Sequence, residues 1–257
     1  MSAFGPMLRA RFLGGTAVCV AALALALAPG AVAGERIPGI DVSRFNGEVA
    51  WEQVGGTRIE FAFVAASRGS GADCAVAPTR CGADPLYDGN YAGAKAAGIR
   101  VGPYHRAFTN GNGRRQVRKD ARAEARTFLA SVGELRAEDL PPALDVEAPF
   151  DGLDRRELRR WVRIWLKRVE RRLGRKPIVY TNASSWAQTG DTLSFARRGH
   201  PLWVANWNVR APIVPANDWA GESWSIWQYT SSGSVPGIDG RVDRNWLRGG
   251  FEALGGG

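Results

Sequence analysis

The feature that most restricts the fold is the alternation of short apolar runs with helix-like segments along residues 34–257. Apolar runs bounded by Gly, Pro, Asn or Asp indicate strands, and apolar residues at helical spacing indicate helices. The predicted strands cover residues 37–42, 59–66, 99–105, 141–147, 177–181, 201–205, 223–229 and 240–243. The predicted helices cover residues 91–97, 116–132 and 155–173.

Strands that are separated by helices pair in parallel through right-handed crossovers. About eight strands in a chain of this length favour closure into a barrel. The later crossovers contain little helix. We therefore expect an α/β fold with one irregular, TIM-like (β/α) barrel that has fewer than eight helices.

The strongest helix signal follows Asp154, which forms a capping box with Glu157, and ends before Gly174. Its opposite face carries nine basic residues between Arg155 and Arg172. That face is either an ordinary solvated surface or a contact for nucleic acid or a wall polymer. The predicted core face of the helix consists of Leu158, Trp161, Val162, Trp165, Leu166, Val169 and Leu173.

Residues 1–33 have the pattern of a secretory signal peptide. Arg9 and Arg11 precede an apolar run over residues 12–27, and Ala31-Val32-Ala33 is a small-residue cleavage site. A retained membrane anchor is the alternative, although the run is short for a span. We therefore expect a secreted, extracellular protein whose single domain covers residues 34–257.

Charge, cysteine and histidine content indicate which kinds of partner, cross-link and metal site to expect. The formal net charge of +9 favours anionic partners such as nucleic acid, anionic lipid or an acidic wall polymer. In a secreted chain the spacing of Cys74 and Cys81 predicts a disulfide that closes a small loop. Only two histidines are present, His105 and His200, and neither is near the cysteines, so we expect no metal site.

Two acids with one residue between them, Asp145 and Glu147, end the fourth predicted strand. Alternate side chains of a strand share a face, and two strand rises separate their Cα atoms by about 6.5–7 Å. Two carboxylates this close repel, so that one pKa rises and a proton donor and a carboxylate coexist. The alternative is that these acids cap the next helix or pair with arginine.

Two further acids belong to the same region if the strands form a barrel. Asp41 ends the first strand and Asp243 ends the last one, and these two strands are neighbours in a closed barrel. Barrel enzymes carry their chemistry at the carboxyl ends of the strands. We therefore expect four carboxylates to face one cavity.

Aromatic residues fall at the same strand ends, and flat rings can stack on the apolar face of a sugar. Many of the ten tryptophans must fill the core instead, Trp161 and Trp165 among them. The aromatic residues predicted at the rim are Tyr104, Tyr180, Trp203, Trp207, Trp227 and Tyr229.

Eight motifs occur in order along nearly all of residues 34–257. They are Gly39-Ile40-Asp41-Val42-Ser43, Phe61-Ala62-Phe63-Val64, Asn90-Tyr91-Ala92-Gly93-Ala94-Lys95-Ala96-Ala97-Gly98, Gly102-Pro103-Tyr104-His105, Ala143-Leu144-Asp145-Val146-Glu147, Pro201-Leu202-Trp203-Val204-Ala205, Trp227-Gln228-Tyr229 and Val242-Asp243-Arg244-Asn245. In these motifs the sequence resembles the glycoside hydrolase family 25 lysozymes, the Chalaropsis-type N-acetylmuramidases.

The resemblance implies hydrolysis of the β-1,4 bond from N-acetylmuramic acid to N-acetylglucosamine in peptidoglycan. It implies that Glu147 is the general acid and that Asp145 orients it or acts on the sugar. Asp41 and Asp243 would hold the N-acetyl group or an attacking water. The stereochemical outcome stays open, because roughly 5–5.5 Å between carboxyls suits a nucleophile and about 6.5–9.5 Å suits a water.

We expect the partner to be peptidoglycan glycan strands. We also expect a monomer with no cofactor, no nucleic acid and no membrane contact after signal cleavage. The predicted substrate-binding residues are Tyr104, Tyr180, Trp203, Asn206 and Trp227.

One segment departs from the family pattern. Members commonly carry Lys-Ala-Thr-Glu-Gly after the second strand, where this chain has Ala65-Ala66-Ser67-Arg68-Gly69. None of the four acids is affected, so the departure concerns substrate contacts. Two alternatives to a muramidase stay open: a glycan-binding barrel with weak or no turnover, and a carboxylate-only metal hydrolase that acts on phosphodiesters.

Overall fold

The computed structural model describes residues 36–70, 81–111, 113–150 and 152–255, together with residues 1, 2 and 5. The predicted signal peptide lies almost entirely outside these ranges, and Cys74 lies outside them as well. The signal peptide and the disulfide of Cys74 with Cys81 therefore stay predictions. Among the described residues, no helix has the length and apolar character needed to cross a membrane.

All strands and helices belong to the compact unit Gly34–Gly257. The strands are β1 (Arg36–Val42), β2 (Phe61–Arg68), β3 (Gly82–Ala83), β4 (Arg100–Arg106), β5 (Ala143–Asp145), β6 (Ile178–Thr181), β7 (Leu202–Ala205), β8 (Ile226–Gly233) and β9 (Val242–Arg248). The helices are α1 (Trp51–Gly55), α3 (Tyr87–Ala96), α4 (Arg114–Val132), α5 (Arg155–Leu173), α6 (Ala183–Ala187) and α7 (Pro215–Ala220). Short 3-10 turns occupy Arg44–Asn46, Ala196–Arg198 and Phe251–Leu254.

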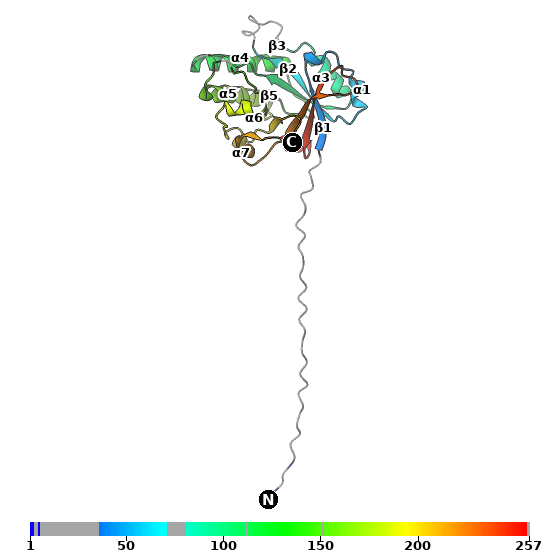
Figure 1. Ribbon diagram of the computed structural model, residues 1–257, viewed down its shortest axis with the longest axis vertical. Coiled ribbons are helices and arrows are strands. Elements are labelled where there is room, and N and C mark those ends of the chain that lie inside the picture. The colour runs from blue at the N-terminus through cyan, green and yellow to red at the C-terminus, as the bar shows by residue number, and fades with distance from the viewer. Residues whose placement is uncertain (3–4, 6–35, 71–80, 112, 151, 256–257) are drawn as a thin grey trace. The chain divides into compact units, whose positions relative to one another are not determined.

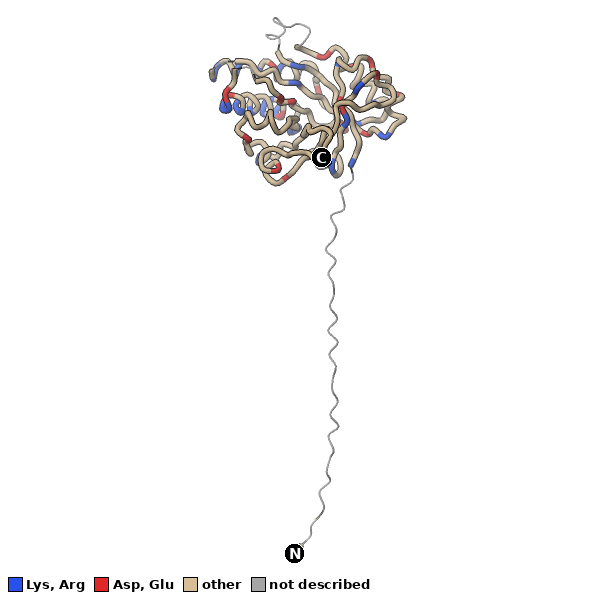
Figure 2. Tube along the Cα trace, viewed as in Figure 1, with Lys and Arg blue, Asp and Glu red and all other residues tan. Residues whose placement is uncertain are grey.

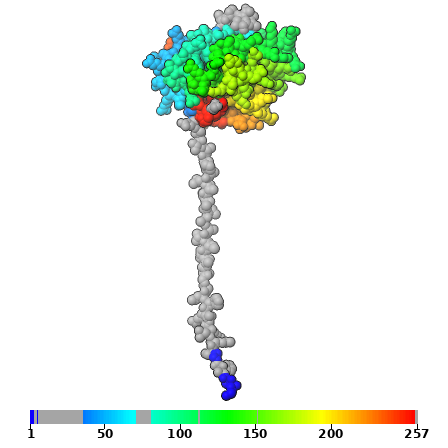
Figure 3. Space-filling view, turned by 180° about the vertical axis from the view of Figure 1, so that it is seen from behind, coloured from blue at the N-terminus to red at the C-terminus, as the bar shows by residue number. Residues whose placement is uncertain are grey.

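Eight of these strands form a closed barrel (Figure 1). Their order is β1-β9-β8-β7-β6-β5-β4-β2, and pairing of β1 with β2 closes the ring, while β3 adds to the edge of β2. Seen from behind, the surface colours of this unit follow the chain around the molecule from blue through green to orange and red (Figure 3). The irregular α/β barrel predicted from the sequence is confirmed, with six labelled α-helices among the described residues.

The last strand runs opposite to the direction that we predicted. β9 is antiparallel to both of its neighbours, β8 and β1. The cause is the short connection from Gly233 to Val242, because a parallel return needs a crossover of roughly a dozen residues or more. Asp243 therefore lies near the start of its strand, and its Cα is paired with that of Asp41. The reversal leaves Asp243 at the predicted rim of the barrel.

The fourth predicted strand is shorter in the structure than residues 141–147. Pro141 and Pro142 have no N–H to donate to a neighbouring strand, and β5 begins only at Ala143. Beyond the end of β5, Val146 N still donates to Tyr180 O at 2.9 Å. Glu147 thus stands just past the strand, on the segment that leaves the barrel.

Two apolar layers hold the barrel together. The interior is filled by large rings and branched side chains, and an outer layer packs the strands against the helices. In α5 the capping box of Asp154 and Glu157 is present, and Trp161 and Trp165 are fully buried as predicted. Burial of two tryptophans on one helix fixes α5 against the barrel, since each ring removes about 150–250 Å² from water.

Many basic residues lie along α4 and α5 (Figure 2). On α4 the exposed stripe consists of Arg114, Arg115, Arg118, Lys119, Arg122 and Arg126. None of these six side chains has a carboxylate within 4.0 Å among the described residues. The stripe and the basic face of α5 form one cationic side of the barrel, which suits an anionic surrounding.

Candidate active site

The four predicted acids line one hollow at the carboxyl ends of the parallel strands. Asp41 comes from β1, Asp145 from β5, Glu147 from the segment after β5, and Asp243 from the start of β9. The hollow has a volume of about 210 Å³. Its lining consists of Asp41, Tyr104, Asp145, Glu147, Tyr180, Trp203, Trp207, Ser231 and Asp243.

This central hollow continues on both sides into a groove. Toward β2 it shares Tyr104 and Asp145 with a hollow of about 140 Å³. Toward α6 it shares Glu147 and Trp207 with a hollow of about 260 Å³. The acids therefore stand in the middle of a channel that is open along its length, which suits an extended polymer rather than a small molecule.

Arg106, at the end of β4, lies against both Asp145 and Glu147. Its Nε is 3.4 Å from Asp145 Oδ2, and its Nη2 is 3.8 Å from Glu147 Oε2. Its Nη1 also donates to the backbone oxygen of Glu147 at 3.1 Å. One guanidinium thus holds both carboxylates on the same side of the barrel mouth, as the alternation of strand side chains predicts. The sequence analysis did not identify Arg106, which adjoins the motif that ends in His105.

Asp145 and Glu147 differ in their access to the groove. The side chain of Asp145 is 11% exposed and that of Glu147 is 25% exposed. Burial raises the pKa of Asp145 well above its usual value; the charge of Arg106 opposes this rise and that of Glu147 adds to it. Asp145 Oδ1 is buried with no hydrogen-bond partner among the described residues. Glu147 Oε1 accepts a hydrogen bond from Asn182 Nδ2 at 3.3 Å.

Asp41 and Asp243 form a second carboxyl pair across the β1–β9 ladder. Burial raises the pKa of Asp41 well above its usual value, and the charge of Asp243 raises it further. Burial also raises the pKa of Asp243. Asp41 Oδ2 accepts hydrogen bonds from Asn245 Nδ2 at 2.8 Å and from Gln228 Nε2 at 3.0 Å. These two amides fix the orientation of Asp41.

Gln228 connects the acids with the aromatic residues. While its Nε2 donates to Asp41, its Oε1 accepts from Tyr180 Oη at 3.0 Å and from Trp207 Nε1 at 2.9 Å. Asn245 makes a similar link, since its Oδ1 accepts from Trp203 Nε1 at 2.8 Å. Both amides occur in motifs that the sequence analysis quoted, but nothing in their local pattern indicated these roles.

Four of the predicted rim aromatics line the groove: Tyr104, Tyr180, Trp203 and Trp207. Trp207 is 45% exposed, so its ring is open to a ligand, while Trp203 is 2% exposed and forms the floor. Asn206 lines the hollow toward α6, where its Oδ1 accepts from Ile213 N at 2.8 Å.

The structure does not bring Trp227 and Tyr229 to the groove. Trp227 packs in the outer layer against Trp224, and its Nε1 donates to Asn206 O at 2.8 Å. Tyr229 stacks on Trp246 with ring centroids 5.1 Å apart. Successive side chains of a strand point to opposite faces. In β8 the side chain of Gln228 points to the inner face, so that of its neighbour Trp227 must point outward.

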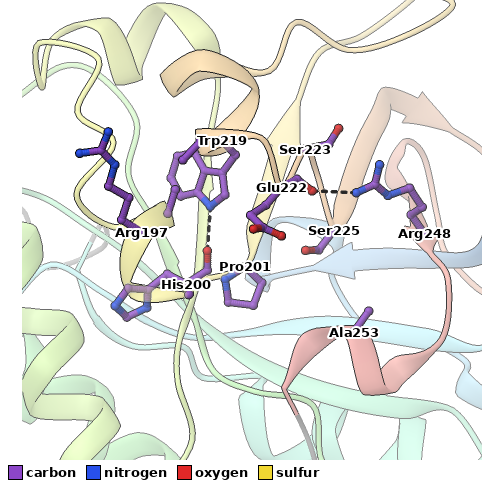
Figure 4. A pocket seen from close by; sticks show the side chains of 12 residues that line it. Arg197, His200, Pro201, Trp219, Glu222, Ser223, Ser225, Arg248 and Ala253 are labelled. Carbon is purple, nitrogen blue, oxygen red and sulfur yellow. Dashed lines mark hydrogen bonds between the residues drawn. The ribbon is translucent and has the colours of Figure 1, made fainter.

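A larger hollow of about 560 Å³ lies at the opposite end of the barrel (Figure 4). It is located where Pro201 precedes β7 and Ser225 precedes β8, and its lining includes Arg197, Glu222 and Arg248 (Figure 4). It offers one carboxylate and no second acid beside it. The acid chemistry of the chain is therefore at the groove.

The side chains of the groove determine which chemical reaction it can support. It presents two carboxyl pairs, one guanidinium and several rings, and this set can supply a proton, a carboxylate and a stacking surface. Among the described residues, no group of three or more His, Cys, Asp and Glu side chains is arranged to hold a metal ion. His105, the histidine nearest the acids in sequence, lies on β4. Its ring is buried and forms hydrogen bonds with Ser67 and Glu124 at 2.8 Å each.

Comparison with known proteins gives consistent results. The family described as glycosyl hydrolases family 25 matches residues 40–238. Lysozyme M1 of Streptomyces globisporus is 33% identical over 221 residues, which cover 83% of this chain and 68% of that protein. The N,O-diacetylmuramidase of Chalaropsis sp. is 26% identical over 223 residues, which cover 80% of this chain and 96% of that enzyme. The crystal structure of a bacterial lysozyme from Streptomyces coelicolor superposes with a TM-score of 0.72 at 32% identity, covering 86% of this chain and 95% of that one.

Proposed function

Because the chain belongs to the glycosyl hydrolases of family 25, we propose that it cleaves the β-1,4 bond from N-acetylmuramic acid to N-acetylglucosamine in bacterial peptidoglycan. It is a glycoside hydrolase of the lysozyme type, with peptidoglycan as the substrate that its relatives imply. The observation that carries the proposal is the groove itself, which continues on both sides of a central group of four acids.

Glu147 donates the proton to the glycosidic oxygen. It is the more exposed carboxyl of its pair, and it borders both the central hollow and the hollow toward α6. A glycan that lies along the groove passes this side chain directly. Asn182 and Arg106 hold the carboxyl group from two sides, so that it does not have to be ordered when the substrate binds.

Asp145 keeps a proton in the pair. Burial raises the pKa of Asp145 well above its usual value, which favours the protonated form of this buried carboxyl. When this proton passes to Glu147, the more accessible carboxyl of the pair, Asp145 is left ionised beside Arg106. The negative charge then stabilises the positive charge that develops on the sugar ring during cleavage.

Asp41 and Asp243 act on the other side of the bond. Their pKa values are both raised by burial, and the amides of Gln228 and Asn245 hold Asp41 in place. This pair supplies a hydrogen-bond acceptor for the N-acetyl group or for an attacking water. Tyr104, Tyr180, Trp203 and Trp207 supply the rings and hydroxyl groups along which the sugars lie, and Asn206 lines the groove toward α6.

The groove is formed within one chain, and we propose a monomer. We also propose that residues 1–33 direct export, which would bring the enzyme to its substrate in the cell wall, and that Cys74 and Cys81 form a disulfide there.

The proposed bond can be identified from the ends that the enzyme produces. Purified peptidoglycan is digested, the new reducing ends are reduced with borohydride, and the sugars are identified by mass spectrometry. We expect N-acetylmuramitol, in equal amount with and without EDTA. N-acetylglucosaminitol would contradict the bond assignment. A protein that binds the wall but yields no new ends would be a glycan-binding barrel, and activity that EDTA abolishes would indicate a metal-dependent hydrolase.

A further inference from the structure

A small hollow of about 140 Å³ extends the groove next to the acids, between β2, β4 and the 3-10 turn Arg44–Asn46. Arg68, Arg106, Asp84 and Asp145 bring charges to its lining. Phe45 stands at its edge and is 72% exposed. Since a water takes about 30 Å³ in the liquid, the hollow has room for a group of about the size of a lactyl side chain.

Arg68 is held in this hollow by rings rather than by acids. Its guanidinium carbon is 5.1 Å from the ring centroid of Phe45 and 4.8 Å from that of Phe108. Its Nε is buried and has no hydrogen-bond partner among the described residues, and no carboxylate there lies within 4.0 Å of it. The two rings fix the orientation of a guanidinium that still has hydrogen-bonding capacity.

The neighbouring arginines differ from Arg68 in this respect. Arg44 Nε is 3.1 Å from Asp84 Oδ2, and Arg106 is shared between Asp145 and Glu147. Arg68 is paired in register with Arg106 on the adjacent strand, where like charges destabilise a sheet. Burial, followed by the charges of Arg106 and Arg44, lowers the pKa of Arg68. The fold therefore keeps an unfavourable positive charge beside its catalytic acids, which is typical of a binding site.

We propose that the hollow around Arg68 is a subsite for a carboxylate that the glycan carries next to the bond being cleaved. This inference rests on the proposed function. The hollow shares Tyr104 and Asp145 with the central part of the groove, so a substituent of the sugar at the acids reaches it directly. A planar guanidinium binds a carboxylate through two parallel hydrogen bonds. The carboxylate belongs either to the lactyl group of muramic acid without peptide or to the stem peptide.

The test compares charged and neutralised substrates in two pairs. One pair is peptide-free glycan with its lactyl carboxylates free or converted to methylamides. The other pair is peptide-bearing glycan with its peptide carboxylates free or converted to methylamides. We expect the wild type to cleave the charged member of one pair with a kcat/KM at least about tenfold higher, as for a hydrogen bond to a charged group. The pair that shows this ratio identifies the source of the carboxylate.

Because the charge of Arg68 also lowers the pKa of Asp145, the readout is the ratio of the two kcat/KM values and not either value alone. The substitution Arg68→Gln is expected to bring that ratio close to one. It removes one of two adjacent like charges, so the melting temperature should not fall. Arg58→Gln removes the same charge at an exposed position before β2, at the far end of the barrel, and should preserve the ratio.

Two results would overturn this inference alone. One is a ratio of kcat/KM on charged and neutralised glycan that is the same for the wild type and Arg68→Gln. The other is a wild type that cleaves charged and neutralised glycans equally well. A wild type that cleaves none of the four glycans would instead overturn the proposed function.

Discussion

Replacing Glu147 with glutamine is expected to lower kcat on purified peptidoglycan by about 10³-fold, because the amide cannot donate a proton to the glycosidic oxygen. The replacement keeps the size of the side chain, and Asn182 Nδ2 can still donate to the amide oxygen at the position of Glu147 Oε1. Binding to insoluble wall and the melting temperature should therefore stay close to those of the wild type. Turnover is measured by the release of reducing ends, and binding by sedimentation with the wall.

The matched control is Glu222→Gln at the opposite end of the barrel. Glu222 is exposed at the larger hollow, and its glutamine variant should turn over at the wild-type rate. Near-normal activity of Glu147→Gln would show that the proton donor has been misassigned. A loss of activity in Glu222→Gln in its place would move the active site to the other end of the barrel.

Replacing Arg106 with glutamine is expected to lower the free energy of unfolding by about 3 kcal/mol at pH 7, because it removes the cation between two partly buried carboxylates. Arg106 also donates to the backbone oxygen of Glu147, so the segment that carries the proton donor loses an anchor. Activity should fall as well. Urea unfolding and rates measured across a range of pH report these two effects separately.

The pH dependence of this variant has a definite sign. The charge of Arg106 lowers the pKa of Asp145, so its removal lets that pKa rise further. The ionised form of Asp145 then disfavours folding more strongly at neutral pH, whereas below the unfolded value of about 4 this cost is absent. The loss of stability should therefore shrink as the pH falls from 7 to 4, and the pH–activity profile should move to higher pH. A loss of stability that is the same at both pH values, with an unmoved profile, would show that Arg106 does not act on the carboxyl pair.

Much of the fold was predictable because local pattern determines it. Runs of apolar residues gave the strands, and the capping box at Asp154 gave the start of α5. Strand direction was not predictable in the same way. The period of a strand is the same in both directions, so Asp243 was assigned to the correct rim but to the wrong end of β9. The short turns α1, α6 and α7 were not predicted, since one or two turns give too few residues for a helical period.

The acids of the candidate site were predictable from their positions at strand ends. The residues that orient them were not, because Arg106, Gln228 and Asn245 have their roles through partners that are distant in sequence. The position of Trp227 could have been predicted from the alternation of side chains along its strand, but that pattern was not applied to it. Alternation along β8 places it on the face opposite Gln228, away from the groove.

The most direct test of the proposed mechanism is a crystal structure of the Glu147→Gln variant with a tetrasaccharide that begins with N-acetylglucosamine at its non-reducing end and alternates with N-acetylmuramic acid. Its central bond runs from N-acetylmuramic acid to N-acetylglucosamine. The sugars should lie along the groove between Phe45 and Trp207, with the central glycosidic oxygen about 2.6–3.2 Å from the introduced amide. A tetrasaccharide bound outside the groove, or one whose central glycosidic oxygen contacts Asp145 or Asp243 and not the amide, would contradict it.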